Sequence, residues 1–263
     1  MVRTEVLKDI KLITEFLHSK YSNGFFIDLG KIVKDEGIYI YYDDYDNAFD
    51  GMLVIDEGDY HIHLNTTRGN YPNSSRSRFS LSHELGHYLI GRHHTDMLNG
   101  ELKPHPSFLK NEQANIYEVE ADHFAANLLM PESKFYNACG GRKLSWNLIL
   151  DLSNKFGTSR LATLIRFSNI IRHELMIIGS QEGIVKWFLS SKDFPKMKHK
   201  FERGKKLPTE ALANLNIVSI SEIHEVDSDD WFVTWGGLSE RQMYEQCYFA
   251  EAYNQTLTLL WFL

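Results

Sequence analysis

The sequence predicts an α+β protein in which a helical domain with a small antiparallel sheet is followed by a smaller, mixed, strand-rich C-terminal domain. Apolar residues recur at helical spacing through most of the chain up to about residue 170. Short runs of β-branched and aromatic residues, separated by Asp, Asn and Gly, occupy residues 37–65, and strand-like segments dominate from residue 174 onward. With 43% apolar content over 263 residues, the chain can bury a sizeable core. We therefore expect domains at residues 1–173 and 174–263.

Two helices and a small sheet are expected at the start of the chain. Residues 4–20 carry apolar side chains three or four positions apart, as on one face of a helix. Residues 27–35 show a similar pattern, which Gly37 ends. The strand-like segments, which we expect to pair as an antiparallel sheet, are residues 37–44, 50–56 and 60–65.

Helical periodicity returns in residues 79–91 and 116–129, and Pro131 ends the second of these segments. The residues between them, from His93 to about Glu112, break the pattern and are expected to form a loop. Shorter helices are expected at residues 132–138, 145–154 and 158–171. In the C-terminal domain the expected strands are residues 174–180, 183–190, 229–237 and 256–263, with a basic loop at residues 194–208.

The composition argues against several classes of protein. The formal net charge of −7 disfavours direct binding of nucleic acid, because phosphate contacts require a basic face, although a local basic patch stays possible. No apolar run reaches about 18 residues and the N-terminal segment is amphipathic, so neither a membrane span nor a signal peptide is expected. Cys139 and Cys247 lie far apart and form no CxxC pattern. We expect a cytoplasmic protein without a disulfide framework.

One motif carries chemistry: residues 83–87 have the sequence His-Glu-Leu-Gly-His, an HExxH pattern. On a helix, His83 and His87 lie on one face and can bind one metal ion, which is typically zinc. Glu84 can then act as the general base that takes a proton from a water molecule activated by the metal. The 12 histidines of the chain raise the chance of an accidental match, but the surrounding residues are strongly helical.

A catalytic zinc site needs a third protein ligand, and the next long helix supplies candidates. Glu120 lies four residues before Phe124, on the side of the apolar stripe, and is our first choice. Glu118 is the second choice. The structural alternative is that Glu118 and Asp122 belong to a solvated helix face and bind no metal.

Two segments resemble the ImmA/IrrE family of metallopeptidases. Residues 78–90, RFSLSHELGHYLI, are similar to the family's lead into its HELGH sequence. Residues 118–131, EVEADHFAANLLMP, resemble the family's Glu-Ala-(Asp or Asn)-x-Phe-Ala-x-x-Leu-Leu-Met-Pro signature. Both occur in the expected order, and the resemblance covers about residues 10–175.

The resemblance implies a zinc metallopeptidase of α+β fold, with His83, His87 and Glu120 as zinc ligands and Glu84 as the base. Members of the family are often encoded with a repressor that they cleave, which releases genes of mobile elements such as prophages, or of stress responses. It therefore implies a protein substrate, namely a helix-turn-helix transcriptional repressor. The resemblance assigns no role to any residue of the C-terminal domain.

Other interpretations stay open from the sequence alone. The protein could hold a metal without catalysis and act by docking as a regulatory protein. It could also contact DNA through the helix pair at residues 152–167, which carries Arg160 and Arg166, although such pairs more often serve packing. His93 and His94 follow the motif helix and are expected to cap or solvate its C-terminal end.

Overall fold

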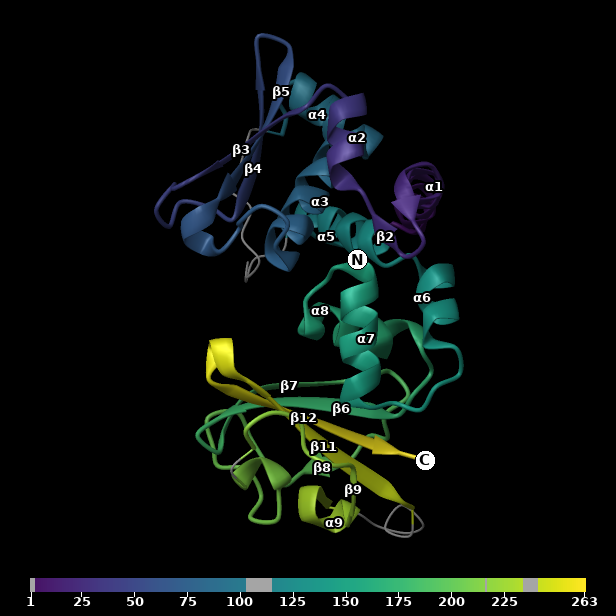
Figure 1. The fold of residues 1–263 in the computed structure, drawn as a ribbon, viewed down its shortest axis with the longest axis vertical. Helices are drawn as coiled ribbons and strands as arrows, with labels where there is room; N and C mark the ends of the chain where they lie inside the picture. The colour runs from purple at the N-terminus through teal and green to yellow at the C-terminus, as the bar shows by residue number, and fades with distance from the viewer. Residues whose placement is uncertain (1–2, 103–114, 216, 234–240) are drawn as a thin grey trace. The chain divides into compact units, whose positions relative to one another are not determined.

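The computed structural model describes residues 3–102, 115–215, 217–233 and 241–263, and it divides into two compact units, most of whose helices and strands are labelled in Figure 1. Unit 1 comprises residues 1–140 and 151–163, and unit 2 comprises residues 141–150 and 164–263. Helices dominate unit 1 and strands dominate unit 2, which confirms the predicted α+β class. Within the described ranges, no helix combines the length and the apolar character that crossing a membrane requires.

The N-terminal part of unit 1 forms helices and a short hairpin: α1 (Thr4–Tyr21), β1 (Ser22–Asn23), β2 (Phe26–Ile27) and α2 (Leu29–Asp35). The α2 helix begins two residues later than expected because Ile27 pairs with Ser22 in the hairpin. The side chain of Asp28 then accepts a hydrogen bond from the backbone N–H of Lys31 and caps the helix.

The sheet of unit 1 contains β3 (Tyr39–Asp43), β4 (Gly51–Asp56) and β5 (Asp59–Asn65) in the order β3-β5-β4. β4 and β5 form the expected antiparallel hairpin, but β3 runs parallel to β5, so the sheet is mixed. The reason lies in residues 44–50, which cross the end of β5 and deliver the chain to its far side. Asn65, at the end of β5, holds this crossing with hydrogen bonds from Nδ2 to the carbonyl oxygens of Asp46 and Phe49.

Alternation along the strands gives the sheet two different faces. Leu53, Ile62 and Leu64 are buried, and helix α3 (Ser75–Leu89) packs against β4 and β5. On the opposite face, His63 stacks on the ring of Tyr41 with centroids 5.0 Å apart. One face of the sheet therefore belongs to the core and packs against α3.

The remaining helices of unit 1 are α4 (Gly91–Leu98), α5 (Ile116–Leu129) and α6 (Glu132–Cys139). Residues 93–98, expected to be a loop, are helical; their sequence, HHTDML, is polar except at its end and gave no apolar periodicity. The later part of that expected loop, residues 103–114, lies outside the described residues.

Arg78, in the sequence that leads into the HExxH motif, anchors α3 to its surroundings. Its buried guanidinium lies 3.9 Å from the ring centroid of Phe26 and donates hydrogen bonds to the carbonyl oxygens of Ile27 and Gly157. Burial lowers the pKa of Arg78 to about 10, so it remains charged at neutral pH. The motif helix is thereby fixed to β2 and to the end of α7 (Trp146–Phe156).

In unit 2 the main strands form an antiparallel sheet in the order β7-β6-β12-β11-β9. They are β6 (Leu175–Gln181), β7 (Ile184–Ser190), β9 (His224–Val226), β11 (Met243–Ala250) and β12 (Gln255–Phe262). The apolar run at the end of the chain is the buried strand β12, as expected. Short elements complete the unit: α8 (Arg160–Ile170), which begins in unit 1, β8 (Lys198–His199), α9 (Ser228–Trp231) and β10 (Phe232–Val233).

Trp146, at the start of α7, explains why residues 141–150 group with unit 2. Its backbone N–H donates to the side-chain oxygen of Gln246 at 2.7 Å, and its indole N–H donates to the backbone oxygen of the same residue. The two units therefore alternate along the chain. The domain boundary at residues 173 and 174 stays a prediction.

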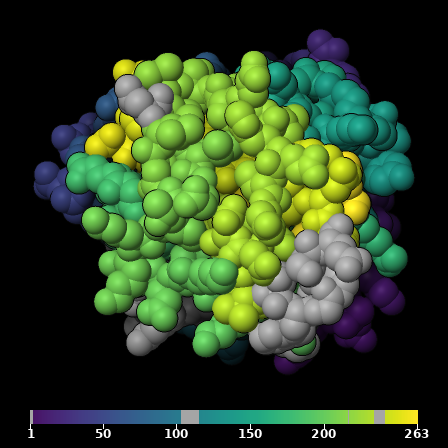
Figure 2. Space-filling view, turned by 90° about the horizontal axis from the view of Figure 1, so that it is seen from below, coloured from purple at the N-terminus to yellow at the C-terminus, as the bar shows by residue number. Residues whose placement is uncertain are grey.

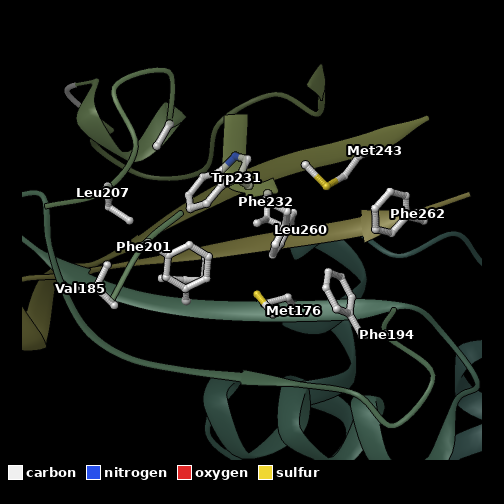
Figure 3. Close-up of a cluster of buried hydrophobic side chains, with 12 residues drawn as sticks. Met176, Val185, Phe194, Phe201, Leu207, Trp231, Phe232, Met243, Leu260 and Phe262 are labelled. Atoms are coloured by element: carbon white, nitrogen blue, oxygen red, sulfur yellow. The ribbon is translucent and has the colours of Figure 1, made fainter. Parts of the chain in front are cut away.

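The core of unit 2 lies between its sheet and the segment that connects β7 to β11. Figure 2 shows this segment, in green and yellow-green, covering most of the face in view. Figure 3 shows the buried side chains gathered beneath it, from the segment and from the strands. They are Met176, Ile178, Val185, Phe194, Phe201, Leu207, Ala211, Trp231, Phe232, Met243, Leu260 and Phe262.

Glu245, on β11, is a carboxyl group buried beside this core. One of its oxygens accepts a hydrogen bond from the backbone N–H of Leu212 at 3.0 Å, and the other accepts one from the indole N–H of Trp231 at 3.3 Å. Burial raises the pKa of Glu245 to about 7, an effect that these hydrogen bonds only partly offset. The folded protein therefore holds a proton that the unfolded chain releases at lower pH.

We predict that Glu245 makes the protein less stable as the pH rises from about 4.5, the ordinary pKa of the group, to about 7. In this window the folded state binds more protons than the unfolded state, so the free energy of unfolding falls, by about 3 kcal/mol in total. Glu245→Gln should remove this dependence, which urea unfolding at pH 5 and pH 8 would measure. Glu222→Gln, the same change at an exposed position, is the control. Equal pH dependence in wild type and Glu245→Gln would contradict the prediction.

Candidate metal centre

Helix α3 presents both histidines of the HExxH motif to one point. Ser74 caps the start of the helix, because its hydroxyl accepts a hydrogen bond from the backbone N–H of Ser77. His83, Glu84 and His87 are all buried. The Nε2 atoms of the two histidines lie 3.2 Å apart, as the spacing of the motif on a helix requires.

Helix α5 adds a carboxylate to this pair, and the carboxylate is that of Glu118. Its Oε2 lies 3.4 Å from Nε2 of His83, and its Oε1 lies 3.2 Å from Nε2 of His87. One ligand atom from each of the three residues lies within 4.8 Å of the others. Glu118, the second choice from the sequence, thus occupies the position expected of a third ligand.

A close contact between α3 and α5 makes this approach possible. Gly86, inside the motif, faces Phe124 so closely that an added Cβ would lie 3.1 Å from the Cβ of Phe124 and 3.2 Å from its ring. A larger residue at position 86 would crowd the side chain of Phe124, and one of the two would have to shift. Glycine at this position therefore allows Glu118 to reach the two histidines.

Glu120, our first choice for the third ligand, is not part of this cluster. Its Oε2 accepts hydrogen bonds from Nη2 of Arg92 at 2.5 Å and from Nε2 of His93 at 2.9 Å. Residues two apart on a helix point about 200° apart, so Glu118 and Glu120 cannot face the same point. The apolar stripe that favoured Glu120 marks the face toward Gly86 and α4. The candidate ligand, Glu118, lies on the neighbouring face, which the sequence also allowed to be solvated.

Asp122 shares that neighbouring face with Glu118 and contacts His83. Its Oδ1 lies 2.9 Å from Nδ1 of His83, the ring nitrogen that points away from the cluster. Burial lowers the pKa of His83, but the hydrogen bonds with Asp122 and Glu118 outweigh burial and raise this pKa to about 10. The surroundings of His83 therefore favour a positive charge at this point, whether a proton or a metal ion.

His93, expected to cap or solvate the end of α3, is instead fully buried against the motif. Its Nδ1 lies 3.2 Å from Nδ1 of His87, while its Nε2 contacts Glu120. Burial lowers the pKa of His93 to about 4, so its ring is neutral at pH 7. Neither His93 nor Asp122 is assigned a role in the site by the residue spacing in the sequence. The available signals were a histidine six residues after His87 and an aspartate four residues after Glu118.

Glu84, the acidic residue of the motif, lies against the start of β4. An added Cβ on Gly51 would lie 2.8 Å from Oε1 of Glu84 and 3.3 Å from its Cγ. Gly51 follows Asp50, a buried carboxylate that accepts hydrogen bonds from Arg68 and Arg76. These charge-assisted contacts fix the backbone that the Glu84 side chain contacts.

The donor set fits a divalent metal ion. Two imidazole nitrogens and a carboxylate converge from rigid helices, and their remaining polar atoms are held by neighbouring side chains. This combination is typical of zinc sites that leave a position open for water, although manganese or iron can accept similar ligands. The structure thus supplies a three-residue site with an acidic side chain, Glu84, next to it on α3.

Comparison with known proteins gives a family match over the same region. The family model described as the IrrE N-terminal-like domain, Peptidase_M78, matches residues 33–168, about half of the chain. No curated protein matches the sequence. Among solved structures, a Mycobacterium tuberculosis transcriptional regulator is similar with a TM-score of 0.54 and 14% identity, covering 96% of this chain and 75% of that chain. At this identity the likeness shows a shared fold.

We predict that Glu118→Ala abolishes binding of one zinc ion per chain, whereas Glu120→Ala still binds one zinc ion when zinc is in excess, although more weakly than wild type. Glu118 offers both of its oxygens to the two histidines, while Glu120 contacts neither of them. Dialysis against zinc, followed by elemental analysis, measures the bound metal. Both variants remove one buried carboxylate from α5, so each serves as the control for the other. Zinc retained in Glu118→Ala and lost in Glu120→Ala would reverse the assignment.

Proposed function

The chain belongs to the family of the IrrE N-terminal-like domain, which is a metallopeptidase family, and on this premise we propose that it is a zinc-dependent endopeptidase that cleaves a protein substrate. The observation that supports this function most strongly is the convergence of His83, His87 and Glu118 beside Glu84. Two imidazoles and one carboxylate next to a buried acid are the parts that hydrolysis by an activated water requires.

The proposed mechanism assigns a separate task to each side chain. His83, His87 and Glu118 would hold the zinc ion, which would supply the acidity that lowers the pKa of a bound water toward about 7 and would polarise the substrate carbonyl group. Glu84 takes a proton from the water as the water oxygen attacks the carbonyl carbon. Glu84 then delivers this proton to the amide nitrogen as the C–N bond breaks.

The position of Glu84 supports its role as the base. The residue is buried, and its carboxylate contacts the backbone of β4 at Gly51. A carboxylate fixed between a helix and a strand loses little conformational entropy on reaching the transition state. Asp122, by its contact with Nδ1 of His83, keeps Nε2 of that ring directed toward Glu118.

For the substrate, we propose a helix-turn-helix transcriptional repressor of a mobile element or a stress response. Support comes from the resemblance of residues 78–90 and 118–131 to a family whose members are often encoded with the repressor that they cleave. Such a substrate accords with a cytoplasmic location, which we also propose. The net charge of −7 favours contact with a basic protein over contact with DNA.

A second candidate function is a metal-holding regulator that acts by docking, without hydrolysis. The likeness of the fold to a transcriptional regulator favours it, and families of peptidases include members without catalysis. The two candidates differ in their need for Glu84. A docking protein retains its effect on its partner when this carboxylate is removed.

We predict that Glu84→Gln retains zinc but reduces cleavage by about 10²- to 10⁴-fold, the range that general-base catalysis contributes. The substitution conserves the shape of the side chain and removes its ability to take a proton. Wild type and variant would each be incubated with the purified repressor encoded nearest to the gene, and products separated by electrophoresis. His83→Ala, expected to lose both zinc and cleavage, is the control. Undiminished cleavage by Glu84→Gln would rule out Glu84 as the base.

We also predict that Gly51→Ala reduces cleavage by about 10- to 100-fold while zinc binding is retained. The added methyl group would lie 2.8 Å from Oε1 of Glu84 and would displace the carboxylate, and a displacement of about 1 Å can have an effect of this size. Gly91→Ala is the matched control, because no atom lies within 4 Å of the added Cβ there. Equal rates for both variants would show that Gly51 does not position the base.

A further inference from the structure

Each histidine of the proposed metal site has one ring nitrogen that faces the site and one that faces a different side chain. The Nε2 atoms of His83 and His87 face each other and Glu118. On the outer side, Nδ1 of His83 contacts Asp122 directly. Nδ1 of His87 lies 3.2 Å from Nδ1 of His93. Two like nitrogens at this distance can form a hydrogen bond only if one carries a hydrogen and the other a lone pair.

Glu120 decides which nitrogen carries the hydrogen. Its Oε2 lies 2.9 Å from Nε2 of His93 and 2.5 Å from Nη2 of Arg92. A carboxylate paired with a guanidinium accepts hydrogen bonds, so Nε2 of His93 must donate. A neutral imidazole has a single N–H, and Nδ1 of His93 therefore carries a lone pair. The hydrogen between the two rings then belongs to Nδ1 of His87, and Nε2 of His87 has its lone pair directed toward the site.

We infer that Glu120 and His93 form a positioning chain that fixes the tautomer and the orientation of His87 for metal binding. Neither residue touches the metal position; both act through His87. The inference rests on the proposed metal site. Glu120, the residue first expected to be a ligand, would then orient a ligand instead, because it contacts His93 and His93 contacts His87.

Contacts between helices α4 and α5 hold Glu120 and His93, the two residues of the positioning chain, in place. Arg92 and His93 are neighbours on α4, and both contact the same oxygen of Glu120. The guanidinium of Arg92 also lies 4.5 Å from the ring centroid of Tyr117, whose hydroxyl donates to Asp96 on α4. His93 has 0% exposure and Glu120 has 0% exposure, so water does not compete for these hydrogen bonds.

Side chains from α5 therefore orient both His83 and His87, one by direct contact and the other through an intervening residue. Asp122 on α5 orients His83 directly, and Glu120 on α5 orients His87 through His93. If the chain were broken, His87 could place its hydrogen on Nε2, where it would be a donor rather than a ligand. Loss of a hydrogen bond to the outer nitrogen of a metal-binding histidine typically weakens metal binding by about 10- to 100-fold.

The test compares His93→Phe, which keeps a ring of similar size and removes both nitrogens, with His94→Phe on the same helix. His94 contacts Tyr60 and does not contact His87. Zinc affinity would be measured by competition with a chromophoric chelator, and the visible spectrum of the cobalt-substituted protein would report the ligand geometry. We expect His93→Phe to bind zinc about 10- to 100-fold more weakly and to alter the cobalt spectrum, while His94→Phe stays within about twofold of wild type.

Rescue by a conservative variant distinguishes hydrogen bonding from packing. In His93→Asn the side-chain oxygen occupies the place of Nδ1 and can accept from His87, although the smaller side chain packs less well. We expect its zinc affinity to lie between those of wild type and His93→Phe. Glu120→Ala, which leaves His93 in place, should weaken binding in the same direction as His93→Phe.

Two results would overturn the inference: a zinc affinity for His93→Phe and Glu120→Ala equal to that of wild type, or an affinity for His93→Asn no better than that of His93→Phe. Far-ultraviolet circular dichroism and the unfolding midpoint of each variant verify that it is folded. If His93→Phe does not fold, Glu120→Ala alone decides. Failure of the metal site itself is recognised separately, because wild type would then bind zinc no better than His83→Ala.

Discussion

The close contact between α3 and α5 at Gly86 is the constraint on which the candidate site depends. An added Cβ there would lie 3.1 Å from the Cβ of Phe124, so the two helices approach too closely for a larger residue to fit at position 86 without a shift. Glu118 lies on α5 before this contact, and the short separation brings its carboxylate within 3.4 Å of both histidines. A wider separation would leave three buried polar side chains without these contacts, which is energetically costly.

Helix α5 serves the site with two of its faces. One face carries Glu118 and Asp122, one turn apart, and both contact His83. Another face carries Glu120, which contacts His93 and Arg92 on α4. Helix α5 thus supplies Glu118, the third candidate ligand, and also the two carboxylates, of Asp122 and Glu120, that orient His83 and His87 from outside the cluster. This arrangement couples the geometry of the site to the packing of α3, α4 and α5, because a movement of α5 would shift all three carboxylates together.

The sequence predicts the parts of the molecule that depend on local spacing. His83, Glu84 and His87 follow from residue spacing on a helix, and most helices and strands follow from their apolar patterns. The choice between Glu118 and Glu120 depends on the rotation of α5 about its axis relative to α3, which apolar periodicity did not fix. The polar helix α4 gave no periodic signal, and consequently His93 was assigned to the surface. The parallel pairing of β3 with β5 follows from the Asn65 contacts, which join residues about 20 positions apart.

A crystal structure of the zinc-loaded protein, with anomalous diffraction measured at the zinc edge, tests the central claim most directly. The account predicts one strong peak bonded to Nε2 of His83, Nε2 of His87 and the carboxylate of Glu118, with Glu120 still in contact with His93. A peak bonded to Glu120 in place of Glu118, or a zinc ion bound away from His83 and His87, would contradict it.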